Sequence, residues 1–309
     1  MNKTGDSGLK ISLVLQPYTG NTSPHELSIA PELIYTQAVK ILKQEGIKEF
    51  SKRTIQLTDK EKNKYGVWNR MGLANSHLGF EVAPLIREKV FVLGLLGNCN
   101  SLSGMLAGLQ NSGKSKKILS VGLVWLDAHG DFNTPETTLS GWLGGMPVAV
   151  AAGKCLHRLR KQAGLNPPLS TQNIIMMGVR DLDPLEEELI FKSSIPMLSI
   201  KQISEKNKII ADSLTRLSNR VEMIYVHIDL DVLDAAYIPG HNFEVSGGLT
   251  PNQLSEIIEH IMQFDKVKAL GIASFPTAKH GREKSMDSAS KLIKGAIQGL
   301  KNRRQMASI

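Results

Sequence analysis

Five side chains of the kind that bind metal ions stand at the ends of two apolar segments. They are Asp127, His129, Asp131, Asp229 and Asp231. Within each segment they alternate with other residues, and side chains two residues apart point to the same face of an extended strand. Each set is therefore expected to project from one face of its strand end. Buried carboxylates that repel one another need a cation to neutralise them, so the pattern predicts a metal site.

The residue types also indicate what such a metal would do. Carboxylates together with an imidazole suit manganese, and less specifically zinc, cobalt or nickel. A hydrated divalent cation lowers the pKa of its water and makes hydroxide available near neutral pH. A single Asp-x-Asp is more typical of a turn or a cap, but this chain has Asp-x-His-x-Asp at one strand end and Asp-x-Asp at another. The combination predicts a hydrolytic metal centre.

Alternating strand and helix patterns surround these residues. Strands are predicted at residues 11–15, 90–96, 118–126, 173–177, 222–228 and 267–272, and helices at residues 31–44, 101–109, 185–191, 204–217, 250–263 and 285–302. Continuous apolar strands between helices are typical of a parallel sheet covered on both faces. We therefore predict an α/β fold with a mostly parallel central sheet, as a single domain over residues 1–309. Ligands bind such sheets beyond the carboxyl ends of the strands, where the acidic residues stand.

The charge of the chain does not by itself indicate a nucleic-acid partner. The net charge is +8 at pH 7, but the lysines are scattered and the densest basic cluster is confined to residues 301–304. Aromatic residues make up 5% of the chain, too few for a surface that stacks single-stranded bases. The composition therefore argues against a nucleic-acid partner.

Cysteine usage and apolar runs predict a cytoplasmic protein that does not enter a membrane. The two cysteines, Cys99 and Cys155, are fewer than a secreted disulfide scaffold uses. Residues 1–6 lack the apolar core of a signal peptide. The longest apolar run, near residues 90–96, is far shorter than the roughly 20 residues of a membrane span.

Residues 127–135, Asp-Ala-His-Gly-Asp-Phe-Asn-Thr-Pro, closely resemble the second motif of the arginase/agmatinase (ureohydrolase) family. Residues 227–234, His-Ile-Asp-Leu-Asp-Val-Leu-Asp, resemble its later Ser-x-Asp-x-Asp-x-x-Asp motif, and the likeness runs from about residue 23 to about residue 276. The resemblance implies a three-layer α/β/α fold, two manganese ions and a homo-oligomer, specifically a trimer. It also implies a hydrolase of carbon–nitrogen bonds in linear amidines, in which metal-activated hydroxide attacks a guanidino carbon and releases urea and an amine.

The resemblance assigns metal roles by position. Asp127 and Asp229 would bridge the two metals, His129 and Asp231 would complete one of them, and Asp131 would belong to the other. The bridging carboxylates are therefore expected to be needed for both metals.

The resemblance also implies substrate-binding residues. In family members that act on arginine, the segment after the metal motif recognises the amino-acid end of the substrate. The matching residues here are Asn133, Thr138 and Ser140, and Asp183 matches a carboxylate that meets the substrate amino group. Their presence favours an arginine-like amino acid over agmatine.

Three positions depart from the family pattern. Cys99, within Leu-Gly-Asn-Cys-Asn-Ser, stands at or next to a metal-binding histidine, and it is either a ligand or a small buried hydrophobe. The metal that uses Asp131 is therefore expected to be weak or absent. Gly144 replaces a histidine that passes a proton to the leaving amine, and Ala273 replaces a glutamate that holds the guanidinium.

Two other histidines lie near the motifs. His241 follows Pro239-Gly240 in a loop that should approach the site. It is the candidate for the missing proton donor, although an exposed loop histidine is the favoured interpretation. His227 is expected to pack in the core or to pair locally.

Two alternatives to an active hydrolase follow from the sequence. The lost residues are also consistent with a catalytically degenerate arginase-like protein that has a binding or regulatory role. Residues 108–115 match the phosphate-loop pattern Gly-x-x-x-x-Gly-Lys-Ser, which would indicate a protein that binds nucleoside triphosphates. A phosphate loop needs a strand before its glycines and a helix after them, whereas the predicted order here is reversed, so we predict a helix-to-strand turn.

Overall fold

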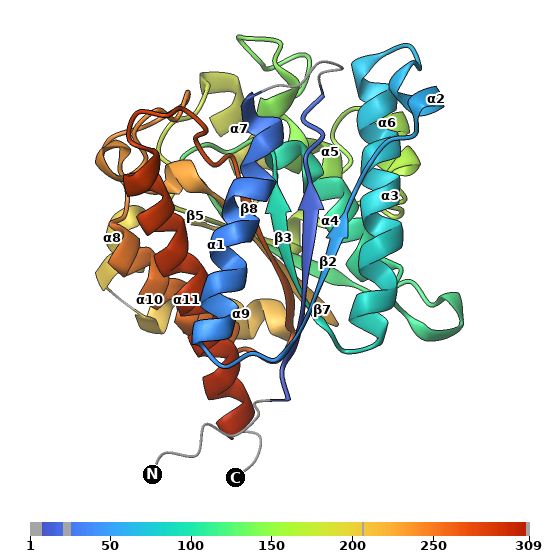
Figure 1. The fold of residues 1–309 in the computed structure, drawn as a ribbon. Coiled ribbons are helices and arrows are strands. Elements are labelled where there is room, and N and C mark those ends of the chain that lie inside the picture. The colour runs from blue at the N-terminus through green and yellow to red at the C-terminus, as the bar shows by residue number, and fades with distance from the viewer. Residues whose placement is uncertain (1–7, 21–25, 206, 307–309) are drawn as a thin grey trace, which may run out of the picture.

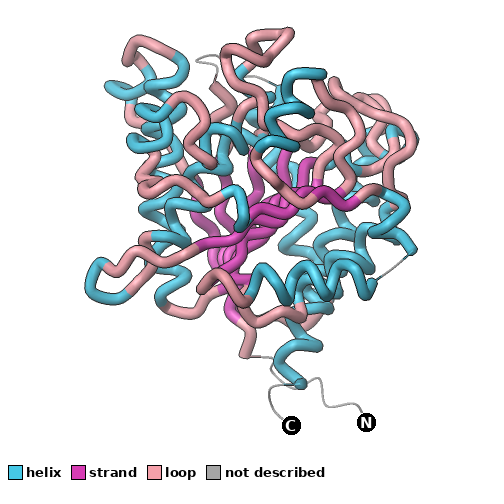
Figure 2. The backbone as a smooth tube through the Cα atoms, turned by 180° about the vertical axis from the view of Figure 1, so that it is seen from behind, coloured by secondary structure: helices cyan, strands magenta, loops and turns pink. Residues whose placement is uncertain are grey.

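A single parallel sheet runs through the computed structural model, which describes residues 8–20, 26–205 and 207–306. Residues 1–6, used in the signal-peptide prediction, lie outside the described part. The eight described strands pair in the order β2-β1-β3-β8-β7-β4-β5-β6, and every neighbouring pair is parallel (Figure 1, Figure 2). The strands are β1 (Lys10–Gln16), β2 (Glu49–Thr54), β3 (Phe91–Leu96), β4 (Val121–Leu126), β5 (Ile174–Met177), β6 (Met197–Leu198), β7 (Met223–Asp229) and β8 (Val267–Ala273).

Helices connect the strands and cover the sheet. They are α1 (Ala30–Gln44), α2 (Asp59–Lys62), α3 (Val67–Arg87), α4 (Leu102–Gln110), α5 (Pro147–Ala151), α6 (His157–Gln162), α7 (Pro184–Lys192), α8 (Ile200–Glu205), α9 (Asn207–Ser218), α10 (Pro251–Met262) and α11 (Arg282–Met306). Figure 1 shows α1, α10 and α11 on one side of the sheet and α3 on the other.

Alternate side chains of the central strands enter two separate hydrophobic cores. In β1, Leu13 packs in the core shared with α1, α10 and α11, whereas Val14 packs in the core shared with α3 and α4. Leu126 and Trp125 of β4 divide in the same way. Successive side chains of a strand point to opposite faces, so both faces of the sheet are buried under helices. The predicted three-layer α/β/α architecture is confirmed.

The sequence pattern predicts neither β2 nor α3. β2 is an edge strand with exposed or partly exposed side chains, so it contains no apolar run. In α3, the buried apolar residues Met71, Leu78 and Val82 are interspersed with buried Gly72, Asn75 and Gly79, which weaken the apolar pattern. A Cβ at Gly79 would lie 3.3 Å from the Ala107 side chain, so this glycine allows α3 to pack closely on α4. The helix predicted at residues 204–217 is divided between α8 and α9, and position 206 lies outside the described residues.

The order of elements around the phosphate-loop pattern is a helix followed by a strand. Gly108 lies inside α4, and the chain passes from α4 through a short 3₁₀ turn, Lys114–Lys116, into β4. This is the predicted helix-to-strand turn. No described helix has both the length and the apolar character that crossing a bilayer requires.

The carboxyl ends of four neighbouring central strands provide the scaffold of the site. β3, β8, β7 and β4 lie side by side in the sheet. Cys99 follows β3, Asp127 follows β4, Asp229 ends β7 and Ser274 follows β8. Because parallel strands end at one edge of a sheet, these side chains are brought together from distant parts of the chain.

Candidate metal centre

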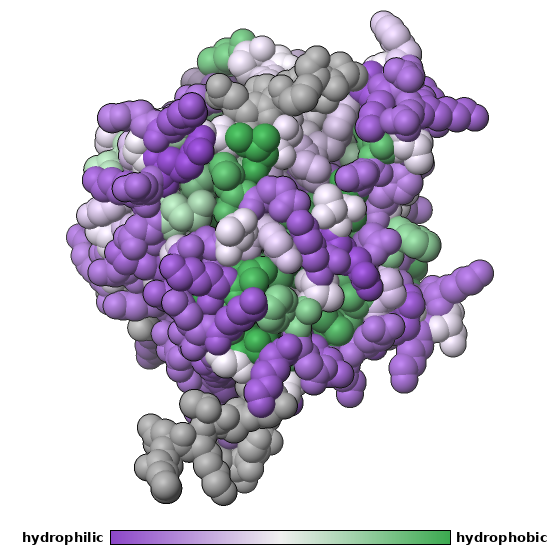
Figure 3. Space-filling model, viewed as in Figure 1, coloured by the Kyte–Doolittle hydropathy of each residue, from purple (hydrophilic) through white to green (hydrophobic). Residues whose placement is uncertain are grey.

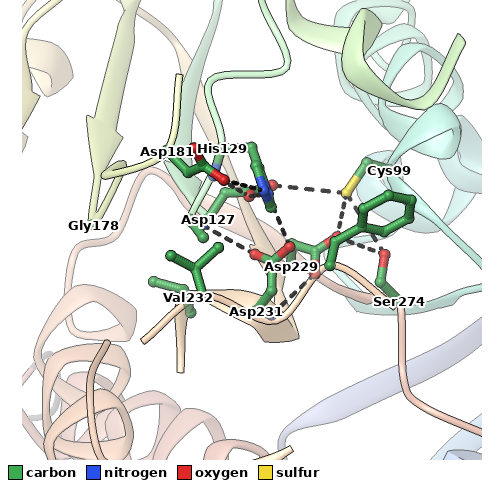
Figure 4. Close-up of polar contacts among 12 residues, drawn as sticks. Cys99, Asp127, His129, Gly178, Asp181, Asp229, Asp231, Val232 and Ser274 are labelled. Atoms are coloured by element: carbon green, nitrogen blue, oxygen red, sulfur yellow. Dashed lines mark hydrogen bonds and ion pairs between the residues drawn. The ribbon is translucent and has the colours of Figure 1, made fainter. Parts of the chain in front are cut away.

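All the predicted metal residues except Asp131, together with His241, bring their ligand atoms into overlapping groups at this edge. The groups are Cys99–Asp127–Asp229, Asp127–His129–Asp231 and Asp229–Asp231–His241, and the ligand atoms of each group lie within 4.8 Å of one another. Each of the three aspartates belongs to two groups, so the carboxylates are shared. Figure 4 shows Cys99 and His129 on different sides of the aspartates.

Backbone amides fix the orientation of the carboxylates. The backbone N–H of His129 donates to Asp127 Oδ1 (2.7 Å), and that of Asp231 donates to Asp229 Oδ1 (3.1 Å). The N–H of Ala128 donates to Asp231 Oδ1 (3.0 Å), which ties the end of β4 to the end of β7. The aspartates are therefore held in place without the help of an ion.

The cluster concentrates negative charge in a buried place. Burial raises the pKa of Asp127 well above its usual range, and the charges of Asp231 and Asp229 raise it further. Nδ1 of His129 lies 3.0 Å from Asp231 Oδ2 and 3.4 Å from Asp127 Oδ1. Burial alone would lower the pKa of His129, but its hydrogen bonds with Asp127 and Asp231 raise the pKa to about 12. The buried negative charge of these carboxylates could be neutralised by a divalent cation.

Cys99 lies against the aspartates. Its Sγ donates to Asp229 Oδ2 at 2.8 Å and lies 3.9 Å from Asp127 Oδ2. Ser274 also donates to Asp229 Oδ2, at 2.5 Å. Burial, together with the charges of Asp229 and Asp127, raises the pKa of the Cys99 thiol. In this state the residue is a thiol rather than a thiolate.

His227 joins Cys99 from the core side. Its Nε2 lies 3.2 Å from Cys99 Sγ, its Nδ1 lies 2.9 Å from the Tyr225 hydroxyl, and its ring stacks on Trp125 with centroids 4.4 Å apart. Burial lowers the pKa of His227 to about 4, so the ring is neutral near pH 7. The position is in the core and locally paired, but contact with the cysteine cannot be predicted from the local sequence.

His241 is buried, which corrects the favoured expectation of an exposed loop histidine. It is only 7% exposed, because its loop turns back over the site at Gly240, which has a φ of 85°. Its Nδ1 accepts a hydrogen bond from the backbone N–H of Phe243 (3.2 Å). Its Nε2 lies 3.6 Å from Asp229 Oδ1 and has no hydrogen-bond partner among the described residues.

A cavity of about 260 Å³ opens beside the cluster. Asp131 lines this cavity but belongs to none of the three groups of ligand atoms. Asn133, Ser140 and Asp183 also line it. Asn133 Nδ2 donates to Asp183 Oδ2 (3.0 Å). Thr138, predicted to bind substrate, is not among the described residues that line this cavity; its hydroxyl oxygen lies 3.4 Å from that of Ser140.

Two charged residues that the sequence pattern did not single out hold the surrounding loops. Arg180 donates to the backbone carbonyls of Asp231 (2.9 Å) and Val245 (2.8 Å), which joins the two segments on either side of His241. Glu186 is 3% exposed and accepts a hydrogen bond from the N–H of Phe132 (2.7 Å). The spacing Asp-Pro-Leu-Glu at residues 183–186 is typical of a helix start, but the bond to Phe132 depends on tertiary structure.

The donors of two of the three groups suit manganese, since Asp229–Asp231–His241 also offers only carboxylates and an imidazole, whereas the group with Cys99 does not. Asp127, His129 and Asp231 offer carboxylate oxygens and an imidazole nitrogen, which manganese accepts. On the other side the third ligand atom is the sulfur of Cys99, beside Asp127 and Asp229. Thiolate sulfur is a soft donor that manganese does not favour.

Comparisons with known proteins agree with the geometry. The family model described as the arginase family matches residues 10–297. The arginase of Bacillus subtilis strain 168 is 34% identical over 184 residues, which cover 59% of this chain and 60% of that protein. The arginase of Bacillus caldovelox is 31% identical over 179 residues, covering 57% of this chain and 58% of that protein. The aligned segments thus span about three fifths of the length of these relatives.

Solved structures extend the likeness over nearly the whole chain. The crystal structure of arginase from Bacillus subtilis matches with a TM-score of 0.81 and 25% identity, covering 93% of this chain and 98% of that one. The formimidoylglutamase of Bacillus subtilis matches in fold with a TM-score of 0.72 and 19% identity, covering 97% of this chain and 89% of that one.

Proposed function

The chain belongs to the arginase family, and from this we propose that it is a hydrolase that cleaves a carbon–nitrogen bond of a guanidino or amidino compound. The proposed substrate is an arginine-type amino acid, and the proposed products are urea and an amine. The observation that carries the proposal is the shared cavity, in which the clustered metal-type residues and the pair Asn133–Asp183 face the same space.

The cavity residues support an amino-acid substrate. Asp183 presents a carboxylate that would accept hydrogen bonds from a substrate ammonium group, and Asn133 orients it by donating to Oδ2. The Ser140 hydroxyl lines the same cavity and can donate to a substrate carboxylate. A substrate without the carboxylate, such as agmatine, would leave Ser140 unused.

Hydrolysis also requires a proton donor. Water adds to the guanidino carbon, the bond to the leaving nitrogen breaks, and that nitrogen must gain a proton. Because Nδ1 of His241 accepts a hydrogen bond from Phe243 N, the neutral ring carries its proton on Nε2. Nε2 lies 3.6 Å from Asp229 Oδ1, and both residues line the cavity. We therefore assign the role of proton donor to His241.

The metal belongs to the proposal as well. Bound divalent cations would supply the Lewis acidity that makes water nucleophilic near neutral pH. Manganese is proposed on the side of the cluster formed by Asp127, His129 and Asp231, where the donors suit it.

The test is urea release by the metal-loaded chain. The full chain is stripped of metal, loaded with Mn²⁺, passed through gel filtration and assayed with arginine and agmatine. We expect urea from arginine in excess of that from agmatine, and none from Asp229→Asn. Asp265→Asn is the control, because its side chain is 87% exposed. The elution volume reports whether the chain is the homo-oligomer that the family resemblance implies.

A catalytically degenerate protein is the competing proposal, supported by Gly144 and Ala273 at positions where a proton donor and a carboxylate are expected. Absence of urea from every guanidino compound tested with the metal-loaded chain would favour it and contradict the hydrolase.

A further inference from the structure

A chain of hydrogen bonds leads from the core to the sulfur of Cys99. The Tyr225 hydroxyl lies 2.9 Å from His227 Nδ1, and His227 Nε2 lies 3.2 Å from Cys99 Sγ. All three side chains are buried. This chain of hydrogen bonds ends at the metal cluster, because Sγ in turn contacts Asp229 Oδ2 at 2.8 Å.

One of the two neutral tautomers of His227 makes the sulfur a hydrogen-bond acceptor. A neutral imidazole has one donor nitrogen and one acceptor nitrogen. In the tautomer in which Nδ1 accepts from the Tyr225 hydroxyl, the His227 proton lies on Nε2 and is directed at Cys99 Sγ. Donation from an N–H stabilises a sulfur that carries negative charge, as the partners of metal ligands do in other sites.

A glycine in the neighbouring strand makes room for these hydrogen-bonded side chains. His227 of β7 lies beside Gly271 of the neighbouring strand β8. A Cβ at Gly271 would lie 2.0 Å from the Tyr225 hydroxyl oxygen, so only glycine leaves room for the phenol. The absence of a side chain at Gly271 of β8 therefore leaves space for Tyr225 and His227 of β7, and His227 contacts Cys99.

An independent feature is a buried histidine nitrogen beside the cluster that makes no hydrogen bond with any described residue. His241 Nε2 is buried and has no hydrogen-bond partner within the described part of the chain, yet it is aimed at Asp229 and Asp231. A buried N–H without an acceptor is costly. The N–H therefore calls for an acceptor atom of a group bound in the cavity, next to Asp229, which the Cys99 ligand set shares.

We infer that Cys99, Asp127 and Asp229 bind a zinc-class cation, Zn²⁺ or Co²⁺, through the thiolate of Cys99, and that His227 is a positioning residue that donates to this thiolate. Zinc and cobalt accept mixed sulfur and oxygen ligands, whereas manganese favours oxygen. Binding forms a metal–sulfur bond, and the thiol proton leaves to solvent, with no change of oxidation state. The inference rests on the proposed function for its shared aspartates, but it is measured without turnover.

The first test uses the absorption spectrum of the cobalt-loaded chain. Metal is removed from the full chain and Co²⁺ alone is added. Thiolate bound to Co²⁺ gives strong charge-transfer absorption in the near ultraviolet, which carboxylates and imidazoles do not give. We expect this band in the unmodified chain and in Cys155→Ser, which removes the only other cysteine, and we expect its loss in Cys99→Ser. A band that is absent from the unmodified chain, or that persists in Cys99→Ser, overturns the inference.

The second test measures metal preference. The chain is offered equal Mn²⁺ and Zn²⁺, gel-filtered and submitted to elemental analysis. Most sites retain zinc over manganese, so the diagnostic quantity is the change in the Zn:Mn ratio on mutation. We expect Cys99→Ser to lower this ratio about 10-fold or more. Cys99→His is the second variant, because it keeps a ligand but removes the sulfur, and circular dichroism establishes that each variant is folded. An unchanged ratio in both folded variants contradicts the inference.

The role of His227 has its own readout. His227→Leu removes the N–H donor, whereas His227→Gln keeps one of similar reach. We expect His227→Leu to weaken Co²⁺ binding by about 10–100-fold and to shift the thiolate band, and His227→Gln to restore part of both. Equal effects of the two substitutions would show that His227 only packs in the core, and would contradict its role as a hydrogen-bond donor to the thiolate.

Urea release on the same samples separates the two proposals. A thiolate band without any turnover would contradict the hydrolase and leave the thiolate site standing. Turnover by the manganese-loaded chain without a thiolate band from cobalt would contradict the thiolate site alone.

Discussion

The indole of Trp142 occupies the space that a side chain at position 144 would need. A Cβ built on Gly144 would lie 2.2 Å from Cη2 of the indole. The indole also stacks on the ring of Phe243, with centroids 4.7 Å apart and an interplanar angle of 24°. The absence of a side chain at position 144 and the aromatic pair that lines the cavity are therefore coupled.

Gly144→Ala should displace the indole from Phe243. The atoms in the way are the far end of the Trp142 side chain, so the ring can move, but the stacking is lost. Such aromatic pairs contribute about 1 kcal/mol. We expect the free energy of unfolding in urea to fall by about this amount. Gly145→Ala is the control, since the nearest atom to its Cβ would be 4.0 Å away. Equal stability of the two variants would contradict the coupling.

His241→Ala should lower kcat without removing metal. General acid catalysis contributes about 100-fold or more to a rate, so we expect a fall of at least this size in urea release. Metal content after gel filtration should be unchanged if the imidazole donates a proton rather than binding the ion. The orientation of Nδ1 toward Phe243 N is the reason for this expectation. Loss of bound metal together with activity would instead make His241 a ligand.

The residues that meet because of strand alternation and parallel strand order could be predicted from the sequence. Alternation at a strand end places Asp127 and His129 together, and parallel strands bring Asp229 to the same edge, so the mixed carboxylate–imidazole cluster follows from the pattern. The fold class follows from the same apolar strands. Both predictions depend on periodicity within short segments.

Contacts between distant segments could not be predicted. The burial of His241 depends on how its loop folds back, and the contact between Cys99 and His227 depends on β8 lying between their strands with a glycine at position 271. The substitution of histidine by Cys99 is visible in the sequence, but its support by His227 is visible only in three dimensions.

Asp127→Asn should separate the stability of the metal-free chain from that of the loaded chain. The carboxylate is buried among like charges, which raise its pKa, so an amide of the same shape relieves repulsion. We expect the metal-free variant to melt at the same temperature as the unmodified chain or above it. A ligand that binds only the folded state raises the melting temperature, and this metal-induced rise should be lost in the variant. An undiminished rise with Mn²⁺ or Zn²⁺ would show that Asp127 is not shared between ligand groups.

Arg180→Gln should destabilise the chain and loosen the site together. The guanidinium donates from Nη2 to the carbonyls of Asp231 and Val245 and from Nε to that of Ser246, whereas glutamine is shorter and has a single donor nitrogen. Hydrogen bonds from charged donors to buried acceptors contribute about 1.5–3 kcal/mol each, so we expect a loss of about 3 kcal/mol in the free energy of unfolding. Metal affinity should fall as well, because Asp231 belongs to two ligand groups.

Arg53→Gln is the matched control, since Arg53 is half exposed and its Nε makes a 3.5 Å ion pair with Glu81. Exposed pairs of this kind contribute about 0–1 kcal/mol. Urea denaturation of both variants, with and without metal, measures the difference. If Arg180→Gln were no more costly than Arg53→Gln, the guanidinium would not be what holds the loops around the cavity.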